Sequence, residues 1–171
     1  DGISLLLIML TTLMGFIAIL CSWSAIQDRV KEYYAMFLLL QTGMIGVFLS
    51  LDFFLFYVFW ELVLVPMYFI IGVWGGPRKL YAAIKFFLYT LFGSVFMLLV
   101  MVGLYLSVND PATGSHTFNI IQMMNPANYT PGSVFSVAAH QTILGMPART
   151  VGFVVLFIAF AIKVPIVPLH T

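Results

Sequence analysis

Long apolar runs dominate the chain, and short polar connections separate them. Several runs exceed the roughly 18 apolar residues that mark a membrane-spanning helix. A spanning segment must be helical, because lipid offers no partner for a free backbone amide or carbonyl. We therefore predict an all-α fold, a polytopic transmembrane helix bundle. Its predicted helices cover about residues 3–24, 33–50, 53–73, 80–107 and 151–165, and the last helix is broken.

The composition supports this assignment to the membrane. Hydrophobic residues make up 63% of the chain and charged residues 8%, whereas soluble domains carry about 25% charged residues. The net charge of +1 comes with no basic stripe, which excludes a nucleic-acid-binding protein. The single cysteine, Cys21, provides neither a disulfide nor a metal-binding spacing. We expect residues 1–171 to form one transmembrane domain fragment, because apolar runs adjoin both ends of the chain.

The polar connections indicate how the chain is oriented in the membrane. Lysines and arginines gather in residues 25–32 and 74–79, whereas the opposite side has none before Arg149. By the positive-inside rule, these two connections face the cytoplasm, and the long loop 108–150 faces outside. Trp23 lies at a cytoplasmic helix end, as aromatic anchors do. The cations of the cytoplasmic side are Arg29, Lys31, Arg78 and Lys79.

The sequence does not decide the structure of two short stretches of the long loop. Residues 118–124 and 134–144 are partly amphipathic, and breaker clusters rich in proline and glycine surround them. Such stretches form either helices that lie on the membrane surface or ordinary loop packed on the bundle.

Two ionisable residues are predicted deep in the hydrocarbon. Glu61 lies about eight residues into the helix 53–73, or ~12 Å from its start, and Lys163 lies ~18 Å into the last helix. An acid or a lysine at such a depth costs about 2.5–3.5 kcal/mol, so a functional role is the first hypothesis for both residues. The alternative for Glu61 is a structural carboxyl bonded to a neighbouring helix.

Prolines directly follow Lys163. Pro165 has no amide hydrogen to donate to the carbonyl of Ala161, and Pro168 has none for that of Val164. We therefore expect two freed carbonyls beside a buried cation, which is the pattern of an ion or proton route. A simple structural kink is the alternative reading.

Weaker signals come from four other residues. Lys85 lies near the start of its helix, where its side chain either extends to the headgroups or relays protons. His170 follows the break and is a second relay candidate, because histidine titrates near neutral pH; interfacial packing is the alternative. Asp52 is the predicted N-cap of the helix 53–73. Pro66 lies in the same helix and removes one further hydrogen bond.

Three stretches resemble one known family. They are FYVFWELVLVPMYFIIGVWGG, RKLYAAIKFFLYT and FAIKVPIVPLHT. They are similar to antiporter-like subunit M, called subunit 4 in mitochondria, of respiratory complex I, the proton-translocating NADH:quinone oxidoreductase. The patterns W-E-L-x-L-x-P and A-F-A-x-K-x-P are specific to this superfamily, and the resemblance covers essentially the whole chain.

The resemblance implies a place in the fold and a role for each site residue. The chain would supply about the third to seventh transmembrane helices of an inverted-repeat, antiporter-like fold with broken helices. The family's key acid falls on Glu61, its key lysine on Lys163, an assisting lysine on Lys85 and a histidine on His170. This chain would hold no cofactor or metal, whereas other subunits of the complex would use NADH, FMN, iron–sulfur clusters and quinone.

We therefore expect a proton-translocating subunit whose buried Glu/Lys pair moves protons while quinone is reduced elsewhere in the complex. Its expected partners are neighbouring membrane subunits of complex I and the lipid bilayer. The expected location is the bacterial plasma membrane, with the mitochondrial inner membrane as alternative. Three other hypotheses stay open: a subunit of a cation/proton (Na+/H+) antiporter, a subunit of a photosynthetic or hydrogenase-linked relative, and a structural membrane scaffold.

Overall fold

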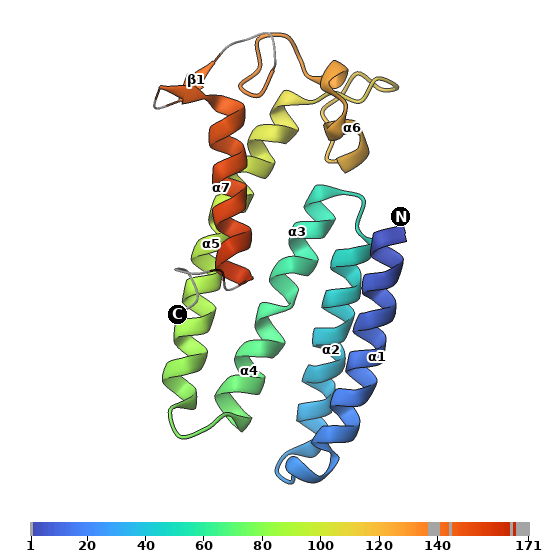
Figure 1. The fold of residues 1–171 in the computed structure, drawn as a ribbon, viewed down its shortest axis with the longest axis vertical. Helices are drawn as coiled ribbons and strands as arrows, with labels where there is room; N and C mark the ends of the chain where they lie inside the picture. Colours follow the sequence, from blue (N-terminus) through green and yellow to red (C-terminus); the bar gives the residue numbers. More distant parts are fainter. Residues whose placement is uncertain (1, 137–140, 144, 165, 167–171) are drawn as a thin grey trace. The chain divides into compact units, whose positions relative to one another are not determined.

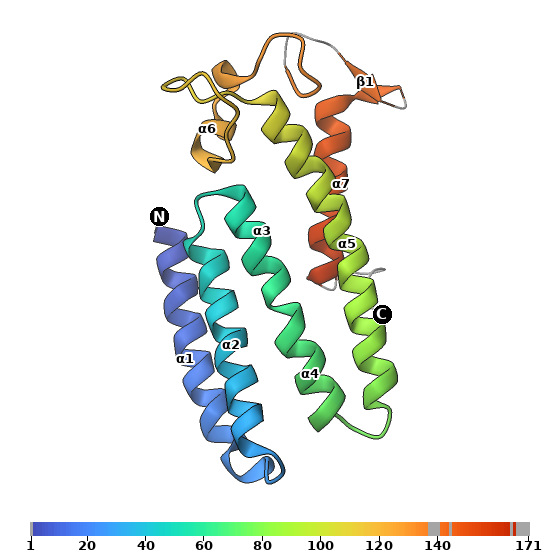
Figure 2. The same cartoon turned by 180° about the vertical axis from the view of Figure 1, so that it is seen from behind.

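The computed structural model describes residues 2–136, 141–143, 145–164 and 166 of the chain. The regular structure of this part is almost entirely helical, as the predicted all-α fold requires (Figures 1 and 2). The main helices are α1 (Gly2–Ala25), α2 (Val30–Leu49), α3 (Phe53–Leu62), α4 (Leu64–Trp74), α5 (Lys79–Ser107) and α7 (Ala148–Lys163). Their apolar composition explains why they form: each one hides its backbone polar groups within itself.

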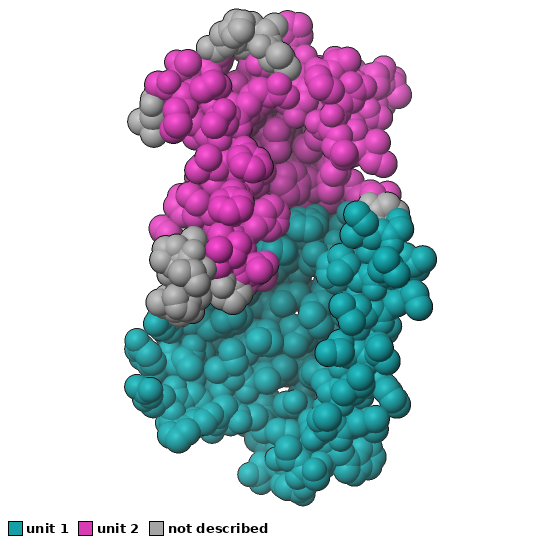
Figure 3. Space-filling view, in the orientation of Figure 1, with its two compact units in different colours: residues 1–50, 55–88 teal, residues 51–54, 89–171 magenta. Residues whose placement is uncertain are grey.

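The chain divides into two compact units (Figure 3). Unit 1 comprises residues 1–50 and 55–88, and unit 2 comprises residues 51–54 and 89–171.

Four spans in the described part are long and apolar enough to cross a membrane. They are Gly2–Ala25, Val30–Leu49, Phe53–Trp74 and Lys79–Ser107. Helix α7 has 16 residues, so its length of ~24 Å falls short of the roughly 30 Å hydrocarbon core. It begins three residues before the predicted start at Val151. Pro165, Pro168 and His170 lie outside the described residues.

Close glycine contacts pack the helices of unit 1. A Cβ atom added at Gly46 of α2 would meet the ring of Phe59, and one added at Gly43 would lie 2.9 Å from Cγ2 of Val63. Small residues let membrane helices approach closely in this way, which places α2 against α3 and α4. On the other side of α4, the rings of Tyr68 and Phe87 meet edge to face at 5.6 Å between centroids.

In unit 2, α7 lies antiparallel to the second half of α5. A Cβ atom added at Gly93 of α5 would lie 2.9 Å from Cγ2 of Ile162 in α7. Ten residues farther along α5, the ring of Phe135 fills the space between Gly103 and Gly152, at 2.7 and 2.6 Å from the Cβ positions of the two glycines. This loop phenylalanine therefore forms part of the core between the two helices.

The loop between α5 and α7 contains short elements of its own. They are α6 (Ile120–Met124), the 3-10 helix η1 (Pro126–Asn128) and the antiparallel strands β1 (Thr142–Ile143) and β2 (Met146–Pro147). Of the two stretches left open by the sequence, 118–124 thus contains a helix, whereas the described residues of 134–144 contain none. Asn119 caps α6, because its side chain accepts a hydrogen bond of 2.9 Å from the amide of Ile121.

The loop is also tied to the start of α3. The amide of Phe53 donates to the carbonyl of Phe118 at 2.8 Å, and Asp52 forms an isolated β-bridge with Asn119. The loop backbone therefore satisfies one of the amides that the beginning of a helix leaves unpaired.

Candidate functional site

Glu61 lies in the last turn of α3, in the middle of the span Phe53–Trp74. The residue is half-buried, and its Oε1 atom has no hydrogen-bond partner and no solvent contact among the residues that the structure describes. An unsatisfied buried oxygen is costly, because burial removes the water that would otherwise bond to it. The hypothesis of a structural carboxyl bonded to a neighbouring helix therefore finds no support in the described residues.

The helix is interrupted two residues after Glu61. Val63 separates α3 from α4 but keeps a right-handed helical conformation, with φ −60° and ψ −28°. The bond from the amide of Met67 to the carbonyl of Val63 is long, at 3.4 Å. Pro66 explains this loosened turn, because its ring carries no amide hydrogen for the carbonyl of Leu62.

Helical spacing places Glu61 on one stripe of α3 and α4. Leu64 and Tyr68 follow it by three and seven residues, and residues at these spacings share a helix face. Leu64 is buried at 2% exposure, and Tyr68 contacts Phe87 of α5. The carboxyl therefore shares its face of the helix with buried Leu64 and half-buried Tyr68, whereas Phe59 and Val63 form the face toward α2.

Lys85 does not lie on the packed face of α5. Ala83, which is 1% exposed, and Phe87 face α4. Lys85 is two residues from each of them, so it projects from the opposite side of the helix, where its side chain is exposed. Glu61 and Lys85 both belong to unit 1 and form no ion pair in the described part of the chain.

Lys163 is the last residue of α7 and is half-buried. It makes at least one hydrogen bond or electrostatic contact. Its neighbour Ile162 is buried against Gly93 of α5. Lys163 belongs to unit 2 and Glu61 to unit 1, and His170 lies outside the described residues.

One prediction about the break is wrong. The sequence suggested that the carbonyl of Ala161 is free, but the amide of Ile166 donates to it at 3.2 Å. Val164 is extended, with φ −93° and ψ 94°, so the chain leaves the helix and a more distant amide reaches the carbonyl that proline cannot satisfy. The helix does end beside Lys163, as the sequence predicted.

A contact between the α5–α7 loop and the start of α7 was not predicted from the sequence. The guanidinium of Arg149 lies 5.4 Å from the centroid of the Tyr129 ring, and the Tyr129 hydroxyl donates to the carbonyl of Met123 at 3.0 Å. Burial raises the pKa of Tyr129, and the charge and hydrogen bond of Arg149 partly oppose this shift. The only sequence signal for this contact was Arg149, an isolated cation at the end of the long loop.

Comparison with known proteins places the chain in a family of membrane proteins. Residues 50–171 match the family described as "NADH:quinone oxidoreductase/Mrp antiporter, TM". NADH-quinone oxidoreductase subunit M of Rhodobacter capsulatus is 43% identical over 171 residues, which are 100% of this chain and 31% of that protein. The subunit M proteins of Escherichia coli K12 and Rickettsia conorii are 42% and 40% identical, over 99% and 100% of this chain.

The chain spans about 30% of the length of these relatives. The family match covers more than half of the chain, and the four apolar spans make it a multi-pass membrane protein. The chain therefore belongs to the transmembrane family of NADH:quinone oxidoreductase and Mrp antiporter subunits.

Proposed function

We propose that this chain is part of a proton-translocating membrane subunit of NADH:quinone oxidoreductase. The observation that carries the proposal is the Glu61 carboxyl, whose Oε1 atom is buried without a partner among the described residues. The names of the relatives, NADH-quinone oxidoreductase subunit M, support the choice of complex. The subunit would work with neighbouring membrane subunits of that complex.

A carboxyl suits this task because both of its protonation states bond well, but differently. The ionised form only accepts hydrogen bonds, whereas the protonated form also donates one. A structural role would favour partners that fix one form. An acid at mid-membrane costs about 2.5–3.5 kcal/mol, and a function that needs the proton to come and go accounts for keeping it there.

Lys163 is the proposed second carrier. Helix α7 would end ~6 Å before the far side of a 30 Å core if Ala148 lies at one surface, which leaves its last residue inside the hydrocarbon. A carboxylate at ~4 Å stabilises an ammonium group by about 4 kcal/mol at an effective dielectric constant of 20. Changing the separation of Glu61 and Lys163 would therefore load and unload the proton.

The remaining roles follow the resemblance. His170 would pass protons to or from Lys163. Lys85 would assist only if a partner or a rearrangement covers its exposed side chain. Electrons would pass from NADH through FMN and iron–sulfur clusters to quinone in other subunits, and this chain would bind none of them. The cation-rich connections would face the cytoplasm of a bacterial cell.

The test is proton pumping by the assembled complex in inverted membrane vesicles. We expect Glu61→Gln and Lys163→Met to remove most of the pH gradient formed per NADH oxidised, because each variant removes one carrier. Asp110→Asn and Lys31→Met are the matched controls, since they make the same chemical changes in the outer loop and at the start of α2. Full pumping in Lys163→Met, with the complex assembled, would refute the proposal.

The same vesicles separate the other candidate functions. A dependence of transport on sodium would favour a cation/proton antiporter, which the family description also names. Transport driven by a donor other than NADH would favour a photosynthetic or hydrogenase-linked relative. Unchanged activity in both site variants would favour a structural scaffold.

A further inference from the structure

A polar pocket lies on the cation-rich side of unit 1. Its volume is about 640 Å³, and it is lined by residues 25–29 of the α1–α2 connection and by Val73, Trp74 and Lys79 at the α4–α5 turn. Polar and apolar atoms both contribute to its wall: Arg29 and Lys79 bring charge, and Ala25, Ile26 and Val73 bring hydrocarbon. The proton-transfer residues take no part in it.

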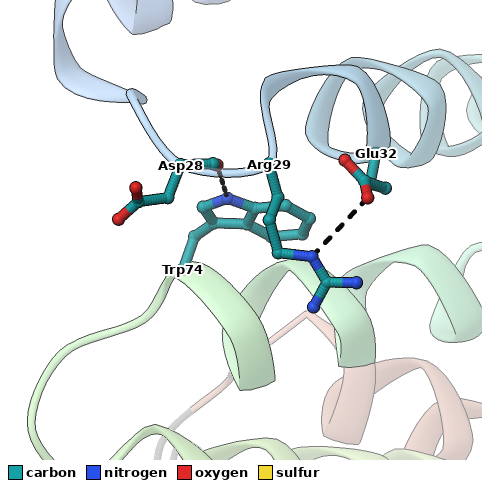
Figure 4. Close-up of polar contacts among 4 residues, drawn as sticks. All are labelled: Asp28, Arg29, Glu32 and Trp74. Atoms are coloured by element: carbon teal, nitrogen blue, oxygen red, sulfur yellow. Dashed lines mark hydrogen bonds and ion pairs between the residues drawn. The ribbon is translucent and has the colours of Figure 1, made fainter.

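Specific contacts hold the two walls of this pocket together. The indole Nε1 of Trp74 donates to the carbonyl of Asp28 at 2.8 Å (Figure 4). Arg29 has a left-handed backbone, with φ 51°, which is uncommon for a residue with a side chain and turns the chain into α2. The Tyr33 ring meets the Trp74 ring edge to face at 5.3 Å. The connection is therefore docked against the end of α4 in a defined conformation.

The cations of the pocket keep hydrogen-bond donors that no described residue uses. The ammonium group of Lys79 donates to the carbonyl of Val73 at 2.7 Å, which uses one of its three hydrogens. Arg29 contacts Glu32 through Nε at 3.6 Å, and both side chains are more than half exposed. Figure 4 shows the Asp28 carboxylate directed away from Arg29. The pocket therefore offers charged donors, and the four cations of the two connections outnumber Asp28 and Glu32.

The pocket also lies at the right depth for a lipid headgroup. It is formed by helix ends, and Tyr33, Tyr34 and Trp74 gather there as aromatic residues do at the membrane surface. Basic pockets between helix ends on the cytoplasmic side are suited to anionic headgroups. We propose that this pocket binds the phosphodiester headgroup of an anionic phospholipid, with Arg29 and Lys79 contacting the phosphate. The apolar part of the wall would then receive the glycerol and upper acyl segments, which a free phosphate ion lacks.

The test uses native membrane vesicles that contain the full-length protein. A phosphatidylglycerol analogue with a photoreactive diazirine at the top of one acyl chain is compared with a phosphatidylcholine analogue that has the same acyl chains. After irradiation, mass spectrometry counts adducts on peptides that cover residues 25–29 and 73–79. We expect the phosphatidylglycerol analogue to label these peptides more strongly, and Arg29→Gln or Lys79→Gln to reduce that labelling about fivefold each.

Matched variants distinguish a pocket from general attraction to the surface. Lys31→Gln and Arg78→Gln remove the same charge nearby but line no part of the pocket, so they should reduce labelling by less than about twofold. Lys79→Arg keeps the positive charge, so it should keep the preference for the phosphatidylglycerol analogue. This variant is the control in case Lys79→Gln loses labelling because it misfolds. Glu32→Gln should increase labelling, because it frees Arg29.

Three results would overturn the proposal. Equal labelling by the two lipids would show that the pocket does not recognise an anionic headgroup. Equal losses in the pocket variants and in Lys31→Gln and Arg78→Gln would show diffuse attraction only. A third contrary result has two parts: excess inorganic phosphate removes the phosphatidylglycerol adducts, and the two lipid analogues label the pocket equally. That result would show that the pocket binds a free anion. None of these measurements depends on whether the protein moves protons.

Discussion

Both units place an ionisable residue beside an interrupted helix, but they do so differently. In unit 1, Glu61 precedes an interruption of one residue, and the helical conformation continues through Val63. In unit 2, α7 ends at Lys163, and the amide of Ile166 reaches back to the carbonyl of Ala161. The carboxyl oxygen of Glu61 lacks a partner among the described residues, whereas Lys163 makes a polar or electrostatic contact.

The two helix interruptions lie in different surroundings. Pro66 is buried between packed helices of unit 1, so the turn loosens but cannot leave the helix path. The end of α7 packs against α5 at Ile162 and Gly93, and Val164 beyond it is extended. The packing differs as well: helices touch directly at glycines in both units, but in unit 2 a loop ring adds a second contact between Gly103 and Gly152.

The prediction with the largest expected effect is that the ring of Phe135 stabilises unit 2 and not unit 1. Phe135→Ala should destabilise the α5–α7 pair by about 3–5 kcal/mol, because it leaves a cavity between two glycines. Hydrogen exchange should accelerate in α7 and stay unchanged in α2. Val134→Ala, at an exposed neighbour, is the control. Equal acceleration in α2 would contradict this division of the molecule.

The second prediction compares the two ionisable residues directly. Glu61→Leu should stabilise the protein against denaturation by sodium dodecyl sulfate by about 2.5–3.5 kcal/mol, because it removes an unpartnered acid from the hydrocarbon. Lys163→Leu should stabilise it less, since Lys163 makes a hydrogen bond, ring contact or electrostatic interaction, whereas the Oε1 atom of Glu61 has no hydrogen-bond partner among the described residues. A larger gain in stability from Lys163→Leu than from Glu61→Leu would contradict this prediction.

A third prediction concerns the direct helix contacts of unit 1. Gly46→Ala should destabilise the protein by about 1–3 kcal/mol, because the new methyl group would overlap the ring of Phe59. Gly72→Ala is the matched control: its Cβ atom would lie 3.6 Å from that of Ala83, an ordinary contact, so we expect a gain of about 0.4–1 kcal/mol. The same denaturation assay measures both, and equal effects would argue against close packing at Gly46.

The smallest effect concerns the Tyr129–Arg149 contact in unit 2. Burial raises the pKa of Tyr129, so the folded state holds the phenol proton more tightly than the unfolded state does. This stabilisation is fully present below pH ~10, the pKa of a free phenol, and is lost as the pH rises through the folded-state pKa. Arg149→Gln should raise the pKa of Tyr129 further and cost about 0.5–1 kcal/mol of cation–π attraction. Ultraviolet titration of the phenolate, with Tyr129→Phe as reference, measures the shift, and a downward shift would contradict the prediction.

Local rules made most of the fold predictable. The apolar runs marked the helices, because lipid forces a spanning segment to satisfy its own backbone. The position of Phe135 between α5 and α7 could not be predicted, since it depends on how a loop folds back over helices distant in sequence. Because Pro165 has no amide hydrogen, the sequence predicted the loss of the helical hydrogen bond to the carbonyl of Ala161. It could not predict that the amide of Ile166 bonds to this carbonyl instead.

The candidate site shows the same limit. The depth of Glu61 follows from counting residues along a helix, and the structure places it in the middle of a span as expected. The exposure of Lys85 depends on which face of α5 contacts α4, and an apolar helix carries no signal for that choice. Only the packed structure, in which Ala83 and Phe87 face α4, shows that Lys85 lies on the opposite side of α5.

The antiparallel contacts of α5 and α7 restrict the evolution of this chain. Gly93 faces Ile162, and Gly103 faces Gly152 across the Phe135 ring, so both helices have the same ten-residue interval between contacts. Deleting one residue from either interval would rotate one contact by ~100° relative to the other. Substitutions between these positions can accumulate over generations, but insertions and deletions should be purged.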